Sequence, residues 1–115
     1  MIFRDTLLCV KVDRSGGGVG IYIKDHLHYT LREAWGVNTH YESIFIEVDM
    51  SERNNIIVGA VYRPPSGNIN LFNDEFDIML ESIGNENKWV FIAGDFNVDL
   101  TKVRDNIAID LFRNV

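Results

Sequence analysis

The chain has 115 residues, a length that fits one domain at most. Hydrophobic residues make up 46% and charged residues 24%, which excludes wholesale disorder. Eleven Lys and Arg residues against 17 Asp and Glu residues give a net charge of -6, which excludes simple electrostatic attraction to phosphate as the whole basis of any nucleic-acid function. The single cysteine, Cys9, excludes an internal disulfide, and no apolar run approaches transmembrane length, so we expect a soluble, intracellular protein.

Short apolar runs predict a strand-rich first half of the chain. Residues 7–12 and 18–23 are two β-type runs on either side of a glycine-containing turn at 13–17, so we expect them to form a hairpin. A weaker strand is expected near residues 29–32.

The next two runs predict a pair of strands with different surroundings. Residues 55–62 are almost continuously apolar, which is typical of a central strand covered on both faces. The short turn at 52–54 predicts that this strand pairs antiparallel with the one before it. That earlier run, 43–49, alternates between two faces: Ile44, Ile46 and Val48 on one, and Phe45, Glu47 and Asp49 on the other.

Proline and glycine mark the boundaries in the second half. Pro64 and Pro65 end the central strand, because proline cannot donate to the sheet ladder. Residues 88–93 predict another buried strand, and residues 105–113 predict the start of a second helix. Together the elements indicate an α/β (α+β) fold class.

One helix is predicted over residues 71–83. Asn70 is expected as its N-cap, and Gly84 as the C′ residue that ends it. Asp74 and Glu75 are expected in the first turn, where they favour the helix dipole. The apolar side chains follow helical spacing along one face: Phe72, Phe76, Met79, Leu80 and Ile83.

The glycine run and the histidines carry weak chemical signals. Residues 16–20 match neither the G-x-G-x-x-G nor the P-loop pattern and lead into a strand, so we expect a turn there and no nucleotide site. The spacing of His26 and His28 could serve one metal from a strand, but no third ligand follows at suitable spacing. We therefore expect a surface or half-packed pair.

Gly-Asp-Phe-Asn at residues 94–97 is the sharpest chemical motif. An apolar run delivers it to a strand end, where α/β folds place functional groups. On an extended backbone the side chains of Asp95 and Asn97 point to the same side, where a carboxylate and an amide can orient a water and hold a phosphoryl oxygen. The tetrapeptide alone favours an alternative, an Asx-turn that closes the strand.

Tyr62 is the second candidate site residue. It ends the apolar run and precedes the Pro-Pro break, so its hydroxyl could be exposed at the same rim as Asp95. Pro64 would fix the loop that follows and limit its entropy. The alternative, which the tyrosine alone favours, is a side chain half-packed at a sheet edge.

Three motifs in order resemble the endonuclease/exonuclease/phosphatase superfamily. The glycine-rich segment at 14–22 resembles its early strand, and Val-Tyr-Arg-Pro-Pro at 61–65 looks like its tyrosine motif. The segment at 89–97 looks like its Gly-Asp-Phe-Asn motif. The Arg-Pro-Pro and Asp-Leu flanks are similar to one branch, the apurinic/apyrimidinic-type endonuclease domain of non-LTR (LINE-like) retrotransposons.

This resemblance implies a fold, a reaction and a set of roles. The fold is a four-layered, DNase I-like α/β sandwich of two mixed sheets with helices outside. The reaction is Mg²⁺-assisted hydrolysis of a phosphodiester, with Mn²⁺ as a substitute, and it nicks target DNA. Asp95 would orient and deprotonate the water, Asn97 would hold a phosphate oxygen and share the metal with Asp95, and Tyr62 would donate to the phosphate. The intact parent would be nuclear, with a reverse transcriptase domain after the endonuclease.

The resemblance covers only the middle of the family domain. Residues 1–115 carry no Asn or Glu motif before Arg14 and no Ser-Asp-His motif after Asn97, so we expect the isolated chain to be inactive. Glu42 and Glu47 follow the glycine-rich strand, and neither is assigned as the metal glutamate. Two alternatives stay open: another phosphoesterase of the superfamily (an inositol phosphatase or a DNase I-like nuclease), or a non-catalytic remnant.

Overall fold

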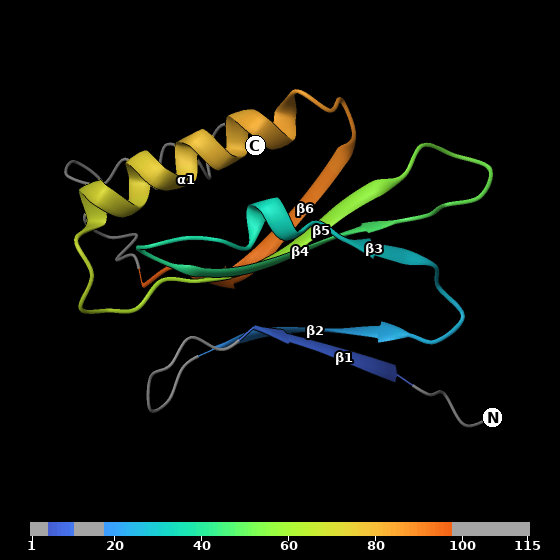
Figure 1. Cartoon of the computed structure of the whole chain (residues 1–115), viewed down its shortest axis with the longest axis horizontal. Helices are drawn as coiled ribbons and strands as arrows, with labels where there is room; N and C mark the ends of the chain where they lie inside the picture. Colours follow the sequence, from blue (N-terminus) through green and yellow to red (C-terminus); the bar gives the residue numbers. More distant parts are fainter. Residues whose placement is uncertain (1–4, 11–17, 98–115) are drawn as a thin grey trace.

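A mixed four-stranded sheet lies between a helix and a two-stranded hairpin (Figure 1). The structure is a computed structural model that describes residues 5–10 and 18–97, the first of these ranges by its backbone. The sheet has the order β3-β4-β5-β6, and the described residues form an α+β arrangement. In chain order the elements are β1 (Asp5–Val10), β2 (Val19–Lys24), β3 (Tyr29–Leu31), the short 3₁₀ helix η1 (Glu33–Trp35), β4 (Glu42–Val48), β5 (Ile56–Tyr62), α1 (Ile69–Gly84) and β6 (Trp89–Asp95).

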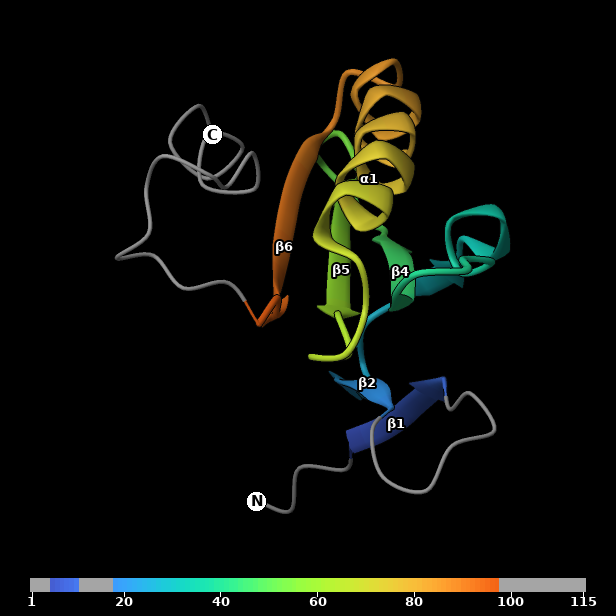
Figure 2. The same ribbon diagram turned by 90° about the vertical axis from the view of Figure 1, so that its left-hand side faces the viewer.

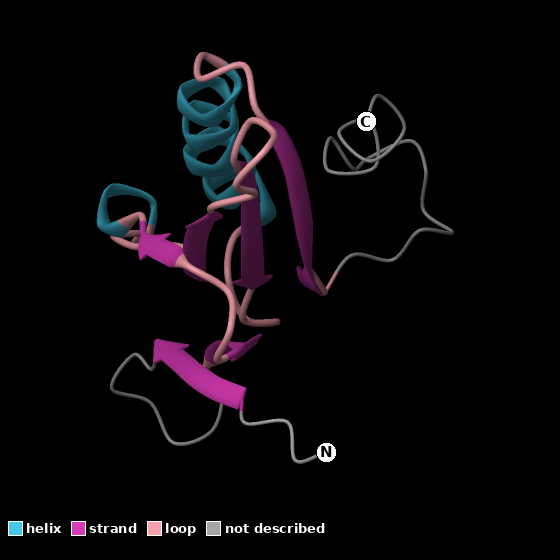
Figure 3. Cartoon of the chain, turned by 90° about the vertical axis from the view of Figure 1, so that its right-hand side faces the viewer, coloured by secondary structure: helices cyan, strands magenta, loops and turns pink. Residues whose placement is uncertain are grey.

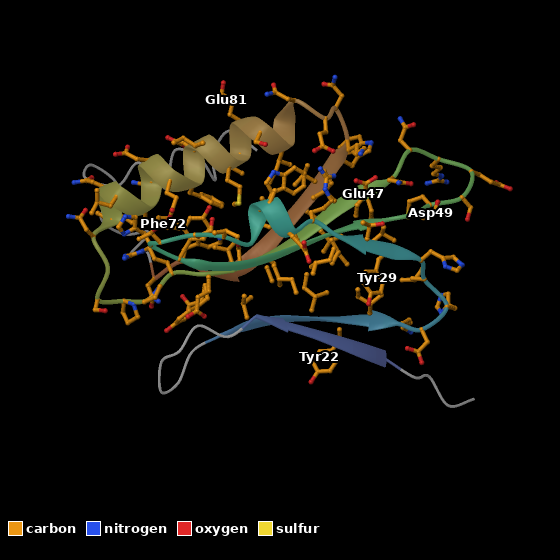
Figure 4. All side chains as sticks on the ribbon, in the orientation of Figure 1. Tyr22, Tyr29, Glu47, Asp49, Phe72 and Glu81 are labelled. Atoms are coloured by element: carbon orange, nitrogen blue, oxygen red, sulfur yellow. The ribbon has the colours of Figure 1, made fainter. Side chains whose placement is uncertain are left out.

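The predicted hairpin is confirmed and covers one face of the sheet. β1 pairs antiparallel with β2 over the full length of both strands. Ile23 of β2 is buried against β4, whereas Tyr22 points away from the sheet and is exposed (Figure 4). The short strand predicted near residues 29–32 is also confirmed, as β3, and it pairs antiparallel with the end of β4.

β4 has two different faces, as its alternation predicts. Phe45 is fully buried in the core beneath the helix, whereas Ile46 and Val48 belong to the core beneath the hairpin. Gly59, opposite Phe45 on β5, makes room for the ring, because a Cβ there would lie 2.2 Å from it. The prediction of a central strand covered on both faces is confirmed for β5: Ile57 and Val61 face the helix, and Ile56 and Val58 face the hairpin.

The segment from β5 to β6 is a β-α-β unit. β5 and β6 are parallel, and α1 crosses between them over the sheet face opposite the hairpin (Figures 2 and 3). The predicted apolar helix face is confirmed, since Phe72, Phe76 and Ile83 are buried against the sheet. Buried aromatic rings form the centre of this core, with Phe72 and Phe76 stacked 5.2 Å apart.

The start of α1 differs from the prediction by two residues. Asn68, not Asn70, is the N-cap: its side-chain oxygen accepts from the backbone N–H groups of Asn70 and Leu71 at 2.9 and 3.3 Å. The Gly67 N–H donates to the Pro64 carbonyl at 3.2 Å, which closes a turn directly before Asn68 and leaves Asn68 free to cap.

The helix end and its acidic residues also differ from the prediction. Gly84 is the last helical residue and not the C′ residue, and the C-cap is Asn85 in a right-handed conformation. Because the helix starts earlier, its first turn contains no acidic residue, so Asp74 and Glu75 lie beyond the region where the dipole favours them. Glu75 instead accepts from the backbone N–H groups of Thr39 and His40.

β6 is less buried than its apolar sequence predicts. Val90 and Ile92 pack against the helix-side core, but Trp89 and Phe91 are 75% and 56% exposed. The reason is its edge position: within the described residues β6 pairs with β5 alone, and the hairpin lies over β4 and β5. The second helix predicted over residues 105–113 lies outside the described residues. No helix in the described ranges is long and apolar enough to cross a membrane.

An ionic cluster joins the start of β6 to β3 and β4. Arg32 bonds to Glu47 at 2.6 Å and to Glu86, while Lys88 lies 3.1 Å from each of the same two carboxylates. Hydrogen bonding from Arg32 is the main cause that lowers the pKa of Glu86 to about 2. The pKa of Glu47 is lowered first by a hydrogen bond from Asn55.

Candidate functional site

The ends of β5 and β6 bring two of the predicted site residues side by side. Tyr62 and Asp95 are partners in the parallel register and are the last residues of their strands. Registered residues on neighbouring strands are about 4.8 Å apart and point to the same face. Tyr62 is half-buried and Asp95 is exposed, so a phenol and a carboxylate share one rim of the sheet. That face is the one covered further along by the hairpin, because Ile56 and Val58 of β5 share it with Tyr62.

Asp95 and Asn97 are held in a turn and not in an extended segment. The Asn97 N–H donates to Asp95 Oδ1 at 3.0 Å, which is the Asx-turn that the sequence offered as an alternative. Asn97 has φ 49°, so the same-side expectation for an extended backbone does not apply. The Asn97 Nδ2 donates to the carbonyl of Arg63, which directs the amide toward the end of β5 and leaves its Oδ1 out of that bond.

Arg63 connects the two loops that follow β5 and β6. Its side chain is buried, with the residue 6% exposed. Nε donates to the carbonyl of Phe96 at 2.8 Å, Nη2 to that of Asn97 at 3.0 Å, and Nη1 to that of Gly67 at 3.0 Å. Its backbone N–H also donates to the Asp95 carbonyl at 2.9 Å. No local sequence signal predicts this role of Arg63, because its partners are up to 34 residues away.

Gly94 is required for the close approach of the two strands. A Cβ at this position would lie 1.8 Å from the carbonyl oxygen of Val61, which is a backbone atom of the central strand. Its φ of 158° is also one that L side chains rarely adopt. Any other residue would push the end of β6 away from β5, so the glycine of the Gly-Asp-Phe-Asn motif sets the distance between Tyr62 and Asp95.

Phe96 anchors the turn in the core. Its ring packs at 6.2 Å from Phe72 and 5.7 Å from Phe76, both on α1. Phe72 lies between the helix and the sheet, as Figure 4 shows. The side chains of Asp95 and Asn97 on either side of Phe96 are exposed. The turn is therefore held by the core through Phe96, while its two polar side chains remain accessible to solvent.

Glu42 is a third polar residue at the same end of the sheet as Tyr62 and Asp95, and it lies on a third strand. It is the antiparallel partner of Tyr62, so Glu42, Tyr62 and Asp95 lie across β4, β5 and β6 at one end of the sheet. Glu42 is 4% exposed, and its Oε2 has no hydrogen-bond partner among the described residues. A buried carboxylate oxygen without a donor is costly, so this atom has acceptor capacity left for a cation or a donor group.

The donor set suits a hard cation. Asp95 and Asn97 offer carboxylate and amide oxygens, which Mg²⁺ prefers, and Mg²⁺ commonly uses one or two carboxylates and keeps several waters. Within the described ranges no group of three His, Cys, Asp or Glu residues stands close enough to hold a metal ion. The residues therefore fit a largely hydrated Mg²⁺ and do not form a closed protein cage. His26 and His28 are both exposed, in the turn between β2 and β3.

Comparisons of the chain with protein-family models, with curated proteins and with solved structures give no match.

Proposed function

We propose that this chain carries part of the active site of a metal-dependent phosphodiesterase that nicks DNA, similar to the endonucleases of non-LTR retrotransposons. The observation that carries the proposal is the placement of Tyr62 beside Asp95 at the end of a parallel strand pair, with Asn97 held in the turn that follows. In-line hydrolysis needs a base near the attacking water and a donor near the phosphate, and this rim offers both.

Each residue has a role that its position supports. Asp95, exposed and adjacent to Tyr62, orients the attacking water and accepts its proton. The Tyr62 hydroxyl donates to a phosphate oxygen as negative charge develops. The second Nδ2 hydrogen of Asn97, outside its bond to Arg63, donates to the same oxygens, and Asn97 Oδ1 would hold Mg²⁺ or Mn²⁺ together with Asp95. When bound, the cation neutralises charge on the phosphate, which an acidic chain needs in order to approach DNA.

The proposal includes the finer fold and the context of the chain. The order helix, sheet, hairpin supports three successive layers of a four-layered DNase I-like sandwich, with the hairpin belonging to the second sheet. Residues 1–115 then form the central part of an endonuclease/exonuclease/phosphatase domain. The partners are target DNA and a reverse transcriptase domain in the parent chain, and the place of action is the nucleus.

The test is nicking of supercoiled plasmid by the polypeptide encoded by this reading frame together with its flanking coding sequence. We expect Mg²⁺-dependent conversion to open circles, lost in Asp95→Ala and kept in Asp74→Ala, which removes an exposed carboxylate from α1. Nicking that survives Asp95→Ala would contradict the assigned role. Release of phosphate from a monoester without nicking would indicate another phosphoesterase of the superfamily, and absence of both activities would indicate a non-catalytic remnant.

A further inference from the structure

We infer that Arg63 is a positioning residue for the Asp95–Asn97 turn: its guanidinium sets the geometry in which Asp95 and Asn97 bind a divalent cation. This inference rests on the proposed function, in that it concerns the cation site of that function. It assigns a task to a residue that makes no contact of its own with metal or water in the proposed reaction.

The contacts of Arg63 are concentrated on the turn. Its Nε and Nη2 donate to two successive carbonyls, those of Phe96 and Asn97, which matches the fixed fork of a guanidinium. The Asn97 amide returns a hydrogen bond to the Arg63 carbonyl. Side chain and backbone of one residue thus hold both the main chain and the side chain of Asn97.

The third donor extends the support to the loop after β5. Nη1 donates to the Gly67 carbonyl at 3.0 Å, so the loop at residues 63–67 and the turn at 95–97 share one buried cation. A lysine cannot reproduce this pattern, because one ammonium cannot reach three carbonyls arranged around a planar fork. The geometry is therefore specific to arginine and not to positive charge.

The charge of Arg63 favours an anion at this rim and repels a cation, so its help to cation binding comes from the placement of the turn. No carboxylate in the described part of the chain forms a salt bridge with Arg63, and its hydrogen-bond acceptors there are neutral backbone carbonyls. A buried cation without a counter-ion costs free energy, and it places a positive field directly beneath the turn. In a chain of net charge -6, that field favours a phosphate at this rim.

The test compares Arg63→Lys with Arg32→Lys in the full 115-residue chain. Arg32 is a matched control, because it also donates to several acceptors but lies in the ionic cluster near the start of β6. Three quantities are measured for each variant: the urea midpoint, the exchange rate of the Asn97 amide, and the Mn²⁺ dissociation constant from paramagnetic broadening of the Asp95–Asn97 amide resonances.

We expect Arg63→Lys to weaken Mn²⁺ binding about tenfold, which corresponds to about 1.4 kcal/mol, and to speed exchange of the Asn97 amide about tenfold. Arg32→Lys should change the urea midpoint and leave both other quantities within twofold of the wild type. A folded Arg63→Lys chain with wild-type Mn²⁺ affinity would overturn the inference, whether or not the Asn97 amide exchanges faster.

Failure of the proposed function gives a different result. If the wild-type chain shows no Mn²⁺ broadening at residues 95–97, the cation site is refuted, and the amide exchange of Asn97 alone decides whether Arg63 orders the turn. If Arg63→Lys does not fold, the test is the solvent-exchange rate of the Arg63 Nε–H in the wild-type chain. Slow exchange supports the buried hydrogen bond to Phe96. Exchange at the rate of a free arginine overturns it.

Discussion

Replacement of Gly94 by alanine tests the close approach of β6 to β5. The new Cβ would lie 1.8 Å from the Val61 carbonyl oxygen and within 2.9 Å of two more backbone atoms of that residue. An ordinary contact begins near 3.4 Å, so the strands must separate by roughly the difference between these distances. Val61 is fully buried in the central strand, so the end of the edge strand β6 must move.

The cost can be worked from the bonds that this movement breaks. Separation on that scale removes the last ladder bond between β5 and β6 and the 2.9 Å bond from the Arg63 N–H to the Asp95 carbonyl. Two lost hydrogen bonds at about 1 kcal/mol each, with residual overpacking of about 1 kcal/mol, give about 3 kcal/mol of lost stability. This is a large share of the roughly 5–15 kcal/mol that stabilises a typical domain.

Gly84→Ala is the matched control for this substitution. Gly84 is helical, and a Cβ there meets nothing within 4 Å, so alanine should stabilise the chain by up to about 1 kcal/mol. The assay is urea unfolding followed by fluorescence of the buried Trp35, with the Mn²⁺ affinity of the turn measured in parallel. A Gly94→Ala chain as stable as Gly84→Ala, within about 0.5 kcal/mol, would refute the reasoning from contact distances.

Two further predictions concern the rest of the fold. The pKa of Glu86 is lowered to about 2 in the folded chain, below the unfolded value of about 4.3. The contribution of Glu86 to the free energy of unfolding is therefore present above about pH 4.3 and is lost as pH falls toward 2. The difference in urea midpoint between the wild type and Glu86→Gln should therefore shrink between pH 6 and pH 3; a constant difference would contradict the ionic cluster. Asn73 is 1% exposed, and neither of its amide atoms has a partner within the part of the chain that the structure describes. Asn73→Ala should therefore raise stability by about 1 kcal/mol, and a loss of more than about 1 kcal/mol would show that the amide has a partner.

The sequence predicts the strands well where the signal is local. The two-residue alternation of β4 assigns Phe45 and Ile46 to opposite cores, because a strand places neighbouring side chains on opposite faces. The exposure of Trp89 and Phe91 could not be predicted in this way. Their apolar run has the same composition as a central strand, and only the sheet order shows that β6 lies at an edge.

In the candidate site, too, local sequence signals predict some residues, whereas others depend on contacts between distant parts of the chain. The positions of Tyr62 and Asp95 at strand ends follow from proline and glycine nearby in the sequence, and their meeting follows from the parallel register. Arg63 and Glu42 carry no comparable signal. Arg63 finds its acceptors up to 34 residues away, and Glu42 reaches Tyr62 only through antiparallel pairing of β4 with β5.

The position of β6 explains why both of its ends carry strong polar contacts. An edge strand with exposed Trp89 and Phe91 gains less from burial than a central strand, so its register needs other support. The Arg32 cluster holds the segment before its first residue, and Arg63 holds the turn after its last. If the two supports act independently, their contributions to stability should add, because they lie at opposite ends of the strand. Only substitutions at the Arg63 end should change cation binding. The comparison therefore distinguishes an effect on the stability of β6 from an effect on the geometry of the rim formed by Tyr62 and Asp95.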